Sequence, residues 1–589
     1  MITYFKEIID IAYEIIFSPL DLTYKNIAIN NCKNKLKIKP EENFGEAYNR
    51  LTGVDKEKGV VYTPIEISSY IIRNTICLDD IIKNPFVKIC DPSCGCGNLI
   101  IPCFNYLKEM FELNLLKING NNTLQIKKSE IMSHIINNNI YGFDIDEFAI
   151  KILKIDLFIE SEGTHTNNLF ECDFLKDKLD IKMDIFIGNP PYVGHKSIEK
   201  EYAIFLKQNY KDIYGDKGDL SYCFFQASLN RLNTGGKLGF ITSRYFIEAP
   251  SGVFLRKLLK DTCSIYKIVD FYGIRPFKNI GIDPVILFIS NEEKSLCDIE
   301  IIKPKFSVGK SKKEFINSLI LNKTENIKRF YVKENSLHNN GWMLIDNKER
   351  EIINKIEAKC SQTLNNICSS YQGIITGCDK AFVVNSKTIK IENLELDIIK
   401  PWIKSSFISK NNVRRENTYI IYSDLINSEY SYINCLSHIE EYKAKLLMRR
   451  ECKRGVRLWY NLQWGRVQKI FEGEKIIFPY KATGNKFAYD VGSYYSADVY
   501  SLVLKNSSPY TYKFLLNILN SKLYEFYFKC LGKKLGDSLY EYYPNNLLKL
   551  CIPPFTINKL YQEDDIYDIF ELTEAERIII EDKFIINTQ

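Results

Sequence analysis

The pattern of apolar and polar positions changes its period along the first half of the chain. Short apolar runs, bounded by Gly, Pro or acidic residues, alternate with longer stretches in which apolar residues recur every three or four positions. The short runs predict buried strands and the longer stretches predict helices. Regular alternation of the two is typical of an α/β fold with a doubly wound sheet. The predicted strands are residues 88–91, 140–144, 166–170, 184–188, 237–242, 268–271 and 285–289.

The rest of the chain follows other patterns. Apolar residues at helical spacing begin at residue 5, so residues 1–58 are predicted to form an N-terminal helical extension. Residues 59–300 form the alternating domain. Residues 301–345 are Lys-rich and weakly patterned and are predicted to be a connection, and residues 346–589 form a mixed α+β second domain. A chain of 589 residues is long enough for two or three hydrophobic cores.

Charge is unevenly distributed. Residues 401–550 hold 23 Lys and Arg against 13 Asp and Glu, whereas the whole chain has a net charge of only +6. A positive field of this kind suits nucleic acid, and a solvated basic face is the alternative. The 17 cysteines follow no disulfide framework and the chain begins with no apolar leader. No apolar run approaches the roughly 18 residues of a membrane span. We therefore expect a cytoplasmic protein with soluble partners.

A glycine turn follows the first predicted strand. Asp91 and Ser93 open it, and Gly95 and Gly97 allow the backbone to approach a ligand before a helix begins. Cys90, Cys94 and Cys96 lie close by, but no second Cys or His pair follows at zinc spacing, so we predict no metal.

Acidic residues also follow the next two predicted strands. Asp144, with Ile145 beside it, stands where the dinucleotide fold places a carboxylate on ribose hydroxyls. Asp173 can accept a hydrogen bond from an adenine amine while Phe174 packs on the ring. Each acid alone is more often a surface turn residue, but acids at successive strand ends indicate one nucleotide-like ligand.

The fourth strand ends in the tetrapeptide Asn189-Pro190-Pro191-Tyr192. Pro191 lacks a backbone N–H and stops the strand, so carbonyl oxygens and an aromatic face gather at its carboxyl end. That combination suits the capture of an amino group on a flat ring. Upstream, Tyr62-Thr63-Pro64 precedes the predicted helix 65–72. Thr63 as N-cap with Pro64 at the helix start is also ordinary capping, so this segment alone has little specificity.

In this order, the motifs resemble those of DNA amino-methyltransferases that use S-adenosylmethionine. Thr63-Pro64 ahead of the glycine turn, and residues 219–222 and 235–241 after the tetrapeptide, match the Taq-type and type IIG-like (gamma) subgroup. The resemblance covers most of residues 59–289 and implies a Rossmann-like S-adenosylmethionine-dependent methyltransferase sheet. By this resemblance, the cofactor-binding residues are Tyr62, Thr63, Pro64, Asp91, Ser93, Gly95, Gly97, Asp144, Ile145, Asp173 and Phe174.

The second domain resembles the target-recognition domain of the same enzymes. Residues 372–382 look like the opening of that domain. Residues 449–455, 463–466 and 496–501 look very like the corresponding region of the sporulation-associated orphan DNA adenine methyltransferases of clostridia. The resemblance implies a short, A-rich, non-palindromic duplex DNA site. It also implies a monomer without an obligate protein partner, associated with the nucleoid when bound to DNA.

The basic cluster 443–469 is the strongest candidate for contact with DNA. It holds nine Lys and Arg and one Glu, interleaved with Trp459, Tyr460 and Trp464. Such a cluster can neutralise phosphates and place planar side chains in a groove; the alternative is a solvated helix over a Trp core. The predicted DNA-binding residues are Gln372, Lys404, Arg454, Arg457, Trp464 and Lys481.

The resemblance implies methylation of adenine N6, with Asn189, Pro190, Pro191 and Tyr192 as the catalytic residues. The Asn189 side-chain oxygen and the Pro190 carbonyl would accept the hydrogens of the amine, and Tyr192 would stack on a flipped base. The methyl group would pass directly to the nitrogen. Cys103 follows Pro102, as the nucleophile of cytosine-C5 methyltransferases follows proline, but it falls inside a helix and is predicted to be core.

Other functions are less consistent with these residues. Cytosine-N4 enzymes use the same amine chemistry but more often carry Ser where Asn189 stands. Intact Asn189 and Tyr192 argue against a nucleic-acid-binding regulator with an inactive methyltransferase fold. Methylation of RNA or of protein glutamine uses the same tetrapeptide, but the large basic second domain suits duplex DNA better. The segments before residue 59 and after residue 550 are too short for a nuclease, so we expect an orphan enzyme.

Overall fold

The structure is a computed structural model of the 589-residue chain. It divides into two compact units, Met1–Asp346 and Asn347–Gln589, which are described separately. None of the described helices is long and apolar enough to cross a membrane. The structure describes residues 2–53, 61–123, 125–178, 181–215, 218–277, 281–292, 298–305, 312–506, 508–536, 538–555 and 562–585.

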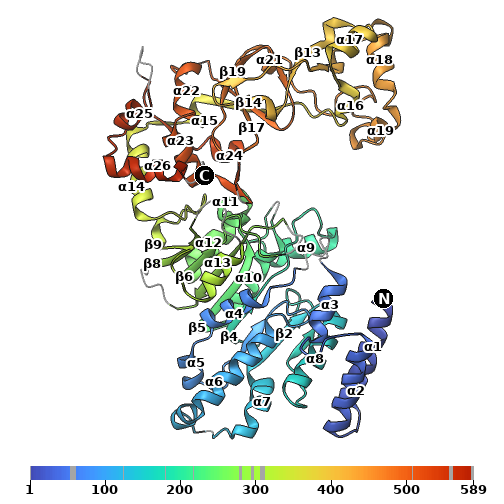
Figure 1. The fold of residues 1–589 in the computed structure, drawn as a ribbon, viewed down its shortest axis with the longest axis vertical. Coiled ribbons are helices and arrows are strands. Elements are labelled where there is room, and N and C mark those ends of the chain that lie inside the picture. The colour runs from blue at the N-terminus through green and yellow to red at the C-terminus, as the bar shows by residue number, and fades with distance from the viewer. Residues whose placement is uncertain are drawn as a thin grey trace. The chain divides into compact units, whose positions relative to one another are not determined.

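A nine-stranded sheet organises the first unit, with strand order β3-β2-β1-β4-β5-β7-β6-β8-β9 (Figure 1). The strands from β3 to β5 are parallel to their neighbours, whereas β7 is antiparallel to β5 and β6. The chain runs from β1 outward to β3 and returns to β4 on the other side of β1, which creates a topological switch point. The strands are β1 Ile89–Asp91, β2 Ile140–Asp144, β3 Leu169–Glu171, β4 Met183–Gly188, β5 Leu232–Ser243, β6 Ser264–Asp270, β7 Pro284–Ser290, β8 Asp298–Pro304 and β9 Ile327–Lys333.

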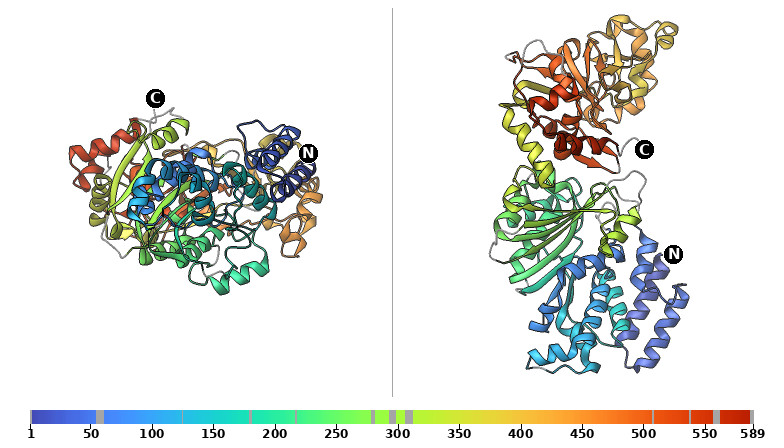
Figure 2. Two further views of the ribbon diagram at one scale, coloured as in Figure 1. Left: turned by 90° about the horizontal axis from the view of Figure 1, so that it is seen from below. Right: turned by 60° about the vertical axis from the view of Figure 1, so that its left-hand side comes forward.

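Helices cover both faces of this sheet (Figure 2). Successive side chains of a strand point to opposite faces, so β7 sends Ile286 and Phe288 into one core and Leu287 and Ile289 into the other. The predicted doubly wound α/β fold is confirmed. The first core lies under α4 Ile65–Thr75, α6 Ile100–Asn121, α8 Glu147–Glu160 and α13 Lys312–Ile320, and the second lies under α10 Leu220–Arg231 and α12 Val253–Thr262.

Residues 301–345 differ from the predicted connection, because they extend the sheet. β8 pairs in parallel with β6, and β9 pairs antiparallel with β8. Ile299 and Ile301 are fully buried, while Arg329 of β9 pairs with Glu300 at 3.1 Å. Charged side chains on an edge strand obscure the alternation of apolar residues in the sequence, and they also discourage pairing with another chain.

Three helices form the N-terminal part of the first unit: α1 Ile2–Phe17, α2 Leu22–Lys35 and α3 Phe44–Thr52. Their apolar faces share a core with Ile152, Ile155 and Phe158 of α8. The predicted N-terminal helices therefore pack directly on a helix of the sheet domain.

The second unit contains two small four-stranded sheets, of order β11-β21-β17-β19 and β12-β16-β13-β20. Helices α18 Ile433–Glu440, α19 Lys443–Leu447 and α20 Arg450–Lys453 precede β17, and α14 Asn347–Lys359 and α26 Glu574–Ile585 pack together. The strands of the two sheets are β11 Cys368–Gln372, β12 Val383–Val384, β13 Ile399–Ile403, β16 Tyr419–Ile421, β17 Glu474–Pro479, β19 Ala488–Val491, β20 Tyr494–Tyr495 and β21 Val499–Leu504.

Candidate functional site

A cavity of about 930 Å³ lies at the carboxyl ends of β1, β2 and β4, beside the switch point. Open α/β sheets bind their ligands at this position. Four of the residues predicted for the site, Pro64, Gly97, Pro190 and Tyr192, are absent from its lining. The predicted residues that do line it are Tyr62, Thr63, Asp91, Ser93, Gly95, Asp144, Ile145, Asp173, Phe174, Asn189 and Pro191.

The glycine turn is held by the acid at the end of β2. Gly95 has φ +49° and donates its N–H to Asp144 Oδ2 at 2.8 Å, so one carboxylate oxygen of Asp144 stabilises the turn. Burial raises the pKa of Asp144. Gly97 has φ +89°, and a Cβ there would lie 2.3 Å from Leu153 of α8. Gly97 thus serves close packing of the turn on α8.

Asp91 carries an unused acceptor at the floor of the cavity. Its side chain is 1% exposed; Oδ1 accepts the Ser93 N–H at 3.0 Å, and Oδ2 has no hydrogen-bond partner in the described part of the chain. Burial, with a smaller contribution from the charge of Asp144, raises the pKa of Asp91 to about 8. An orphaned carboxylate oxygen in a cavity suits a ligand that brings a cationic amino group.

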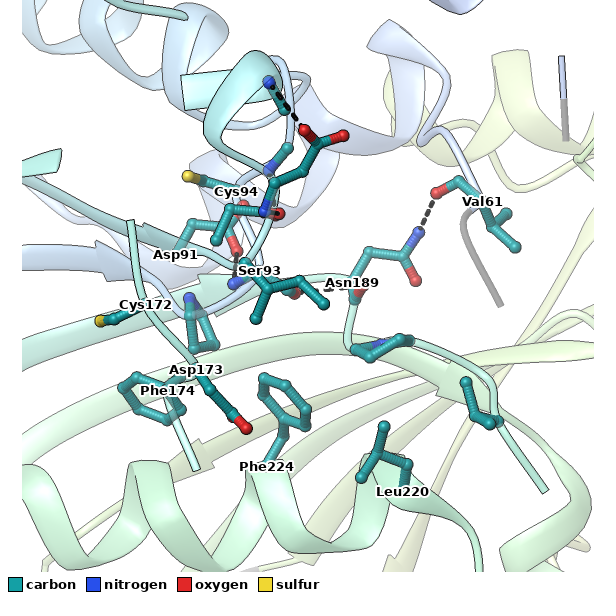
Figure 3. Close-up of a pocket in the computed structure, with 18 of the residues that line it drawn as sticks. Val61, Asp91, Ser93, Cys94, Cys172, Asp173, Phe174, Asn189, Leu220 and Phe224 are labelled. Carbon is teal, nitrogen blue, oxygen red and sulfur yellow. Dashed lines mark hydrogen bonds between the residues drawn. The ribbon is translucent and has the colours of Figure 1, made fainter. Parts of the chain in front are cut away.

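Asp173 and Phe174 lie on the wall of the cavity near Phe224 (Figure 3). Asp173 accepts the Leu175 N–H at 3.0 Å. Phe174 is only 2% exposed, and its ring is stacked with Phe224 at 5.9 Å. Phe174 therefore presents little surface to a ligand, whereas Ile145 is 75% exposed at the end of β2.

The side chain of Asn189 has a fixed orientation (Figure 3). Its Nδ2 donates to the Val61 carbonyl at 2.9 Å and to Thr63 Oγ1 at 3.0 Å, which uses both amide hydrogens. Its Oδ1 is buried without a hydrogen-bond partner among the described residues. The ordinary alternative, in which Thr63 caps helix α4, does not hold: Pro64 is the N-cap residue and makes no side-chain cap hydrogen bond.

Tyr192 lies outside the cavity lining, although its neighbours Pro191 and Val193 belong to it. Its ring centroid is 6.2 Å from that of Phe277, and its hydroxyl donates to the Ile241 carbonyl at 3.5 Å. Burial raises the pKa of Tyr192 well above its usual value. Phe277, which is 4% exposed, was not predicted, because it lies 85 residues from Tyr192 and no local pattern links the two.

Several residues that do line the cavity were missed for the same reason. Lys6 of α1 and Tyr48 of α3 reach the cavity from the N-terminal helices. Tyr202 and Phe205 come from α9 Lys200–Asn209, where their rings stack at 5.9 Å. The Lys176 ammonium lies 4.8 Å from the Tyr202 ring. Only packing of distant helices brings these side chains to the sheet edge.

In the second unit, three of the predicted DNA-binding residues make internal contacts. Gln372 donates to the Ala497 carbonyl at 3.3 Å and accepts from Arg466 at 2.8 Å. Lys404 lies 3.7 Å from Asp379, and Arg457 pairs with Asp424 at 3.1 Å.

The remaining three are more exposed. Arg454 and Lys481 are exposed, and Trp464 is 41% exposed with the Arg457 guanidinium 5.9 Å from its ring. Tyr460 is 6% exposed, and Trp459 packs against the core. Trp459 and Tyr460 therefore fit the alternative of aromatic residues in the core beneath the basic cluster. Within the described cluster 443–469, only Trp464 has an exposed ring.

Family comparisons match three segments of the chain. Residues 138–277 match the Eco57I restriction-modification methylase, residues 78–185 match the DNA-methyltransferase domain of MmeI, and residues 400–552 match the TaqI-like C-terminal specificity domain. These segments are similar to restriction-modification methylases. S-adenosylmethionine is the cofactor of such methyltransferases, and the orphaned Asp91 oxygen in the cavity suits its amino group.

Two curated proteins match most of the length of this chain. The type II methyltransferase M.BstVI of Geobacillus stearothermophilus is 24% identical, over 89% of this chain and 98% of that protein. The restriction enzyme and methyltransferase RM.Eco57I of Escherichia coli is also 24% identical, over 90% of this chain, which spans 58% of that protein.

Two solved structures share the fold of this chain. The type IIL restriction-modification enzyme MmeI, solved in complex with DNA, has a TM-score of 0.60 at 14% identity, over 90% of this chain and 73% of that one. A nuclease-deletion mutant of the type ISP enzyme LlaGI, solved with a DNA substrate mimic, has a TM-score of 0.51 at 14% identity, over 98% of this chain and 62% of that one.

Proposed function

We propose that this protein is a site-specific DNA methyltransferase that transfers a methyl group from S-adenosylmethionine to N6 of a flipped adenine. The observation that carries the proposal is the unsatisfied Oδ1 of Asn189 at the end of β4. A buried acceptor without a partner costs about 1–3 kcal/mol, and a bound amine would remove that cost. The acceptor therefore suits a ligand that brings an amino group.

The chemistry follows from the electronic structure of the target amine. Its lone pair is delocalised into the adenine ring, which makes the nitrogen a weak nucleophile. Asn189 Oδ1 and the Pro190 carbonyl would accept the two hydrogens and favour a tetrahedral nitrogen whose lone pair is free to attack. No side chain needs to form a covalent intermediate.

The aromatic residues near the tetrapeptide would hold the flipped base. Extruding a base from a duplex costs a few kcal/mol, which stacking and hydrogen bonds must offset. Tyr192 provides one ring beside Pro191, and Phe277 lies next to it. Pro191 stops β4 at this point, so the tetrapeptide stays at the edge of the sheet.

The cofactor would occupy the cavity at the ends of β1 and β2. Asp91 would hold its amino group, Asp144 and Ile145 its ribose, and Asp173 its adenine amine, while Tyr62, Thr63, Ser93 and Gly95 complete the wall. When bound, S-adenosylmethionine supplies an electrophilic methyl group. The residues of the chain only bind, orient and shield the reactants.

The second unit would recognise the duplex. Its match to the TaqI-like specificity domain and its exposed Arg454, Trp464 and Lys481 support this role. The resemblance of residues 449–455, 463–466 and 496–501 to CamA, the sporulation-associated orphan adenine methyltransferase of clostridia, supports a short, A-rich, non-palindromic site and an enzyme that acts without a nuclease. The internal contacts of Gln372, Lys404 and Arg457 would then hold these side chains in fixed positions for contact with DNA.

A methylation assay on unmethylated DNA tests the proposal. The purified full chain is incubated with a random-sequence duplex library and labelled S-adenosylmethionine, and modified bases are located by single-molecule sequencing. We expect N6-methyladenine in one sequence context with the wild type and with Asn121→Ala, an exposed control on α6, and no product with Asn189→Ala. N4-methylcytosine would instead establish the cytosine alternative, and no product from the wild type would contradict the proposal.

A further inference from the structure

We infer that Thr63 is a positioning residue that fixes the carboxamide of Asn189, and that helix α3 holds Thr63 in place through Asn98 and Asn49. This inference rests on the proposed function, because it assigns a step of amine capture to residues that do not touch the amine. It also gives the N-terminal helices a role in the active site beyond covering α8.

The carboxamide of Asn189 can work in only one of its two orientations. With Oδ1 toward the cavity, the carboxamide accepts a hydrogen bond from an amine. With Nδ2 toward the cavity, the N–H groups of the carboxamide and of the amine would face each other without a hydrogen bond. The Val61 carbonyl can only accept, at 2.9 Å from Nδ2. Thr63 Oγ1 is the second acceptor, at 3.0 Å. Together they use both hydrogens and leave Oδ1 free, so the orientation follows from hydrogen bonding.

Thr63 is itself held from the N-terminal side. Asn98 Nδ2 donates to the Thr63 carbonyl at 3.5 Å, and Asn49 Nδ2 donates to Asn98 Oδ1 at 2.9 Å. Next to this relay, the hydroxyls of Thr52 and Tyr62 lie 3.1 Å apart. Helix α3 is therefore linked to the segment 62–63 directly by Thr52 and, through Asn98, by Asn49.

Helix α3 is anchored firmly enough to serve this purpose. The buried Asp156 of α8 accepts the N–H groups of Phe44 and Gly45, the first two residues of α3, at 3.0 and 2.9 Å. A Cβ on Gly45 would lie 2.7 Å from the Cys96 carbonyl, so α3 sits directly on the glycine turn. These contacts leave α3 little freedom to move away from the site.

The buried environment of Thr63 supports the assignment. Thr63 is 5% exposed, and its hydroxyl takes no part in capping α4, the ordinary role of Thr at this position. A hydroxyl is needed because valine, which has the same shape, offers no acceptor. Serine keeps the acceptor and loses only a methyl group.

The test compares Thr63→Val with Thr63→Ser in the full chain. Single-turnover methyl transfer gives the rate of the chemical step, calorimetry gives the S-adenosylmethionine affinity, and 2-aminopurine at the target position reports base flipping. We expect Thr63→Val to slow transfer about tenfold, the equivalent of one lost hydrogen bond in the transition state, with cofactor affinity and flipping signal unchanged within about twofold. Thr63→Ser should recover most of the rate.

Two further variants complete the design. Asn49→Ala breaks the relay at α3 and should slow transfer about threefold, because the Asn98 and Val61 contacts remain. Thr75→Val is the matched control. Among the described residues the buried Thr75 hydroxyl bonds only to the Ile71 carbonyl, within α4, and the transfer rate of this variant should equal that of the wild type.

Three outcomes would overturn the inference. A Thr63→Val rate equal to wild type would remove Thr63 from positioning. A weaker cofactor affinity with an unchanged transfer rate would make Thr63 a cofactor ligand only. Failure of Thr63→Ser to recover the rate would exclude the hydroxyl as the cause. If the wild type transfers no methyl group to adenine, the proposed function itself fails, and that result is distinct from all three.

Discussion

The carboxyl end of the large sheet and the predicted DNA-binding residues of the second unit differ in whether their polar atoms already have hydrogen-bond partners. At the sheet edge, Asp91 Oδ2 and Asn189 Oδ1 are buried acceptors with no partner among the residues described. In the second unit, Gln372 and Arg457 are already engaged by neighbours of the same unit. The carboxyl end of the sheet therefore presents unpaired acceptors to a ligand, whereas many polar side chains of the second unit stabilise its own fold.

Arg449 makes this contrast clearest. It lies in the basic cluster 443–469 and was counted with the charge expected to face DNA. Its guanidinium instead donates to the carbonyls of Thr376, Trp459 and Asn461 at 2.8–3.1 Å. A high local density of Lys and Arg therefore overestimates the charge available to phosphates, since some of it organises loops that carry no regular structure.

The largest effect on methyl transfer is expected from a substitution at the carboxyl end of β4. Asn189→Ala removes the acceptor and should lower the transfer rate by at least about a hundredfold, as loss of a transition-state hydrogen-bonding group does. Affinity for duplex DNA, measured by fluorescence anisotropy, should stay within about threefold of wild type, because the second unit is unchanged. A strong loss of DNA affinity would mean that Asn189 supports the fold rather than the chemistry.

The pH dependence of cofactor binding should report Asp91. Its pKa of about 8 means that the carboxyl is mostly neutral at pH 6 to 7, whereas a cationic amino group favours the ionised form. Cofactor binding should therefore release a proton, and affinity should rise with pH by up to about tenfold per unit until it levels near pH 8. Calorimetry in buffers of different ionisation enthalpy measures the release, and Asp91→Asn should abolish it.

Stability should separate two neighbouring arginines of the second unit. Arg449→Gln breaks several charge-assisted hydrogen bonds and should destabilise this unit by about 2 kcal/mol, while Arg454→Gln, at an exposed position, should change its stability by less than about 0.5 kcal/mol. Thermal unfolding followed by near-UV circular dichroism distinguishes the two. Equal midpoints would remove the structural role of Arg449.

The smallest effect should appear in the salt dependence of DNA binding. Each phosphate contact contributes about 0.9 to the slope of log affinity against log salt. Arg454→Gln and Lys481→Gln should each lower that slope by about 1, whereas Lys117→Gln, exposed on α6 of the first unit, should leave it unchanged. An unaltered slope in both variants would exclude these residues from the DNA interface.

Sequence reasoning succeeded where the fold follows from local pattern. The predicted strand 140–144 coincides with β2, and 184–188 differs from β4 by one residue. It failed at residues 301–345, because the charged side chains of β8 and β9 hide their alternation. It missed Tyr48 and Lys6, which line the cavity, and Phe277, which packs near Tyr192, because each comes from a segment far away in the chain.

The sequence by itself determined that the acidic residues and the tetrapeptide lie together at the carboxyl ends of the parallel strands. Parallel strands joined by helices bring their carboxyl ends together whatever the loops do, so chain order alone places Asp91, Asp144, Asp173 and Asn189 in one region. Only the tertiary structure decided which atoms of those residues remain free. Asn189 turns Oδ1 toward the cavity because Val61 and Thr63, more than 120 residues away, hold its Nδ2. Hydrogen bonds between such distant segments leave no periodic signal, and packing alone determines them.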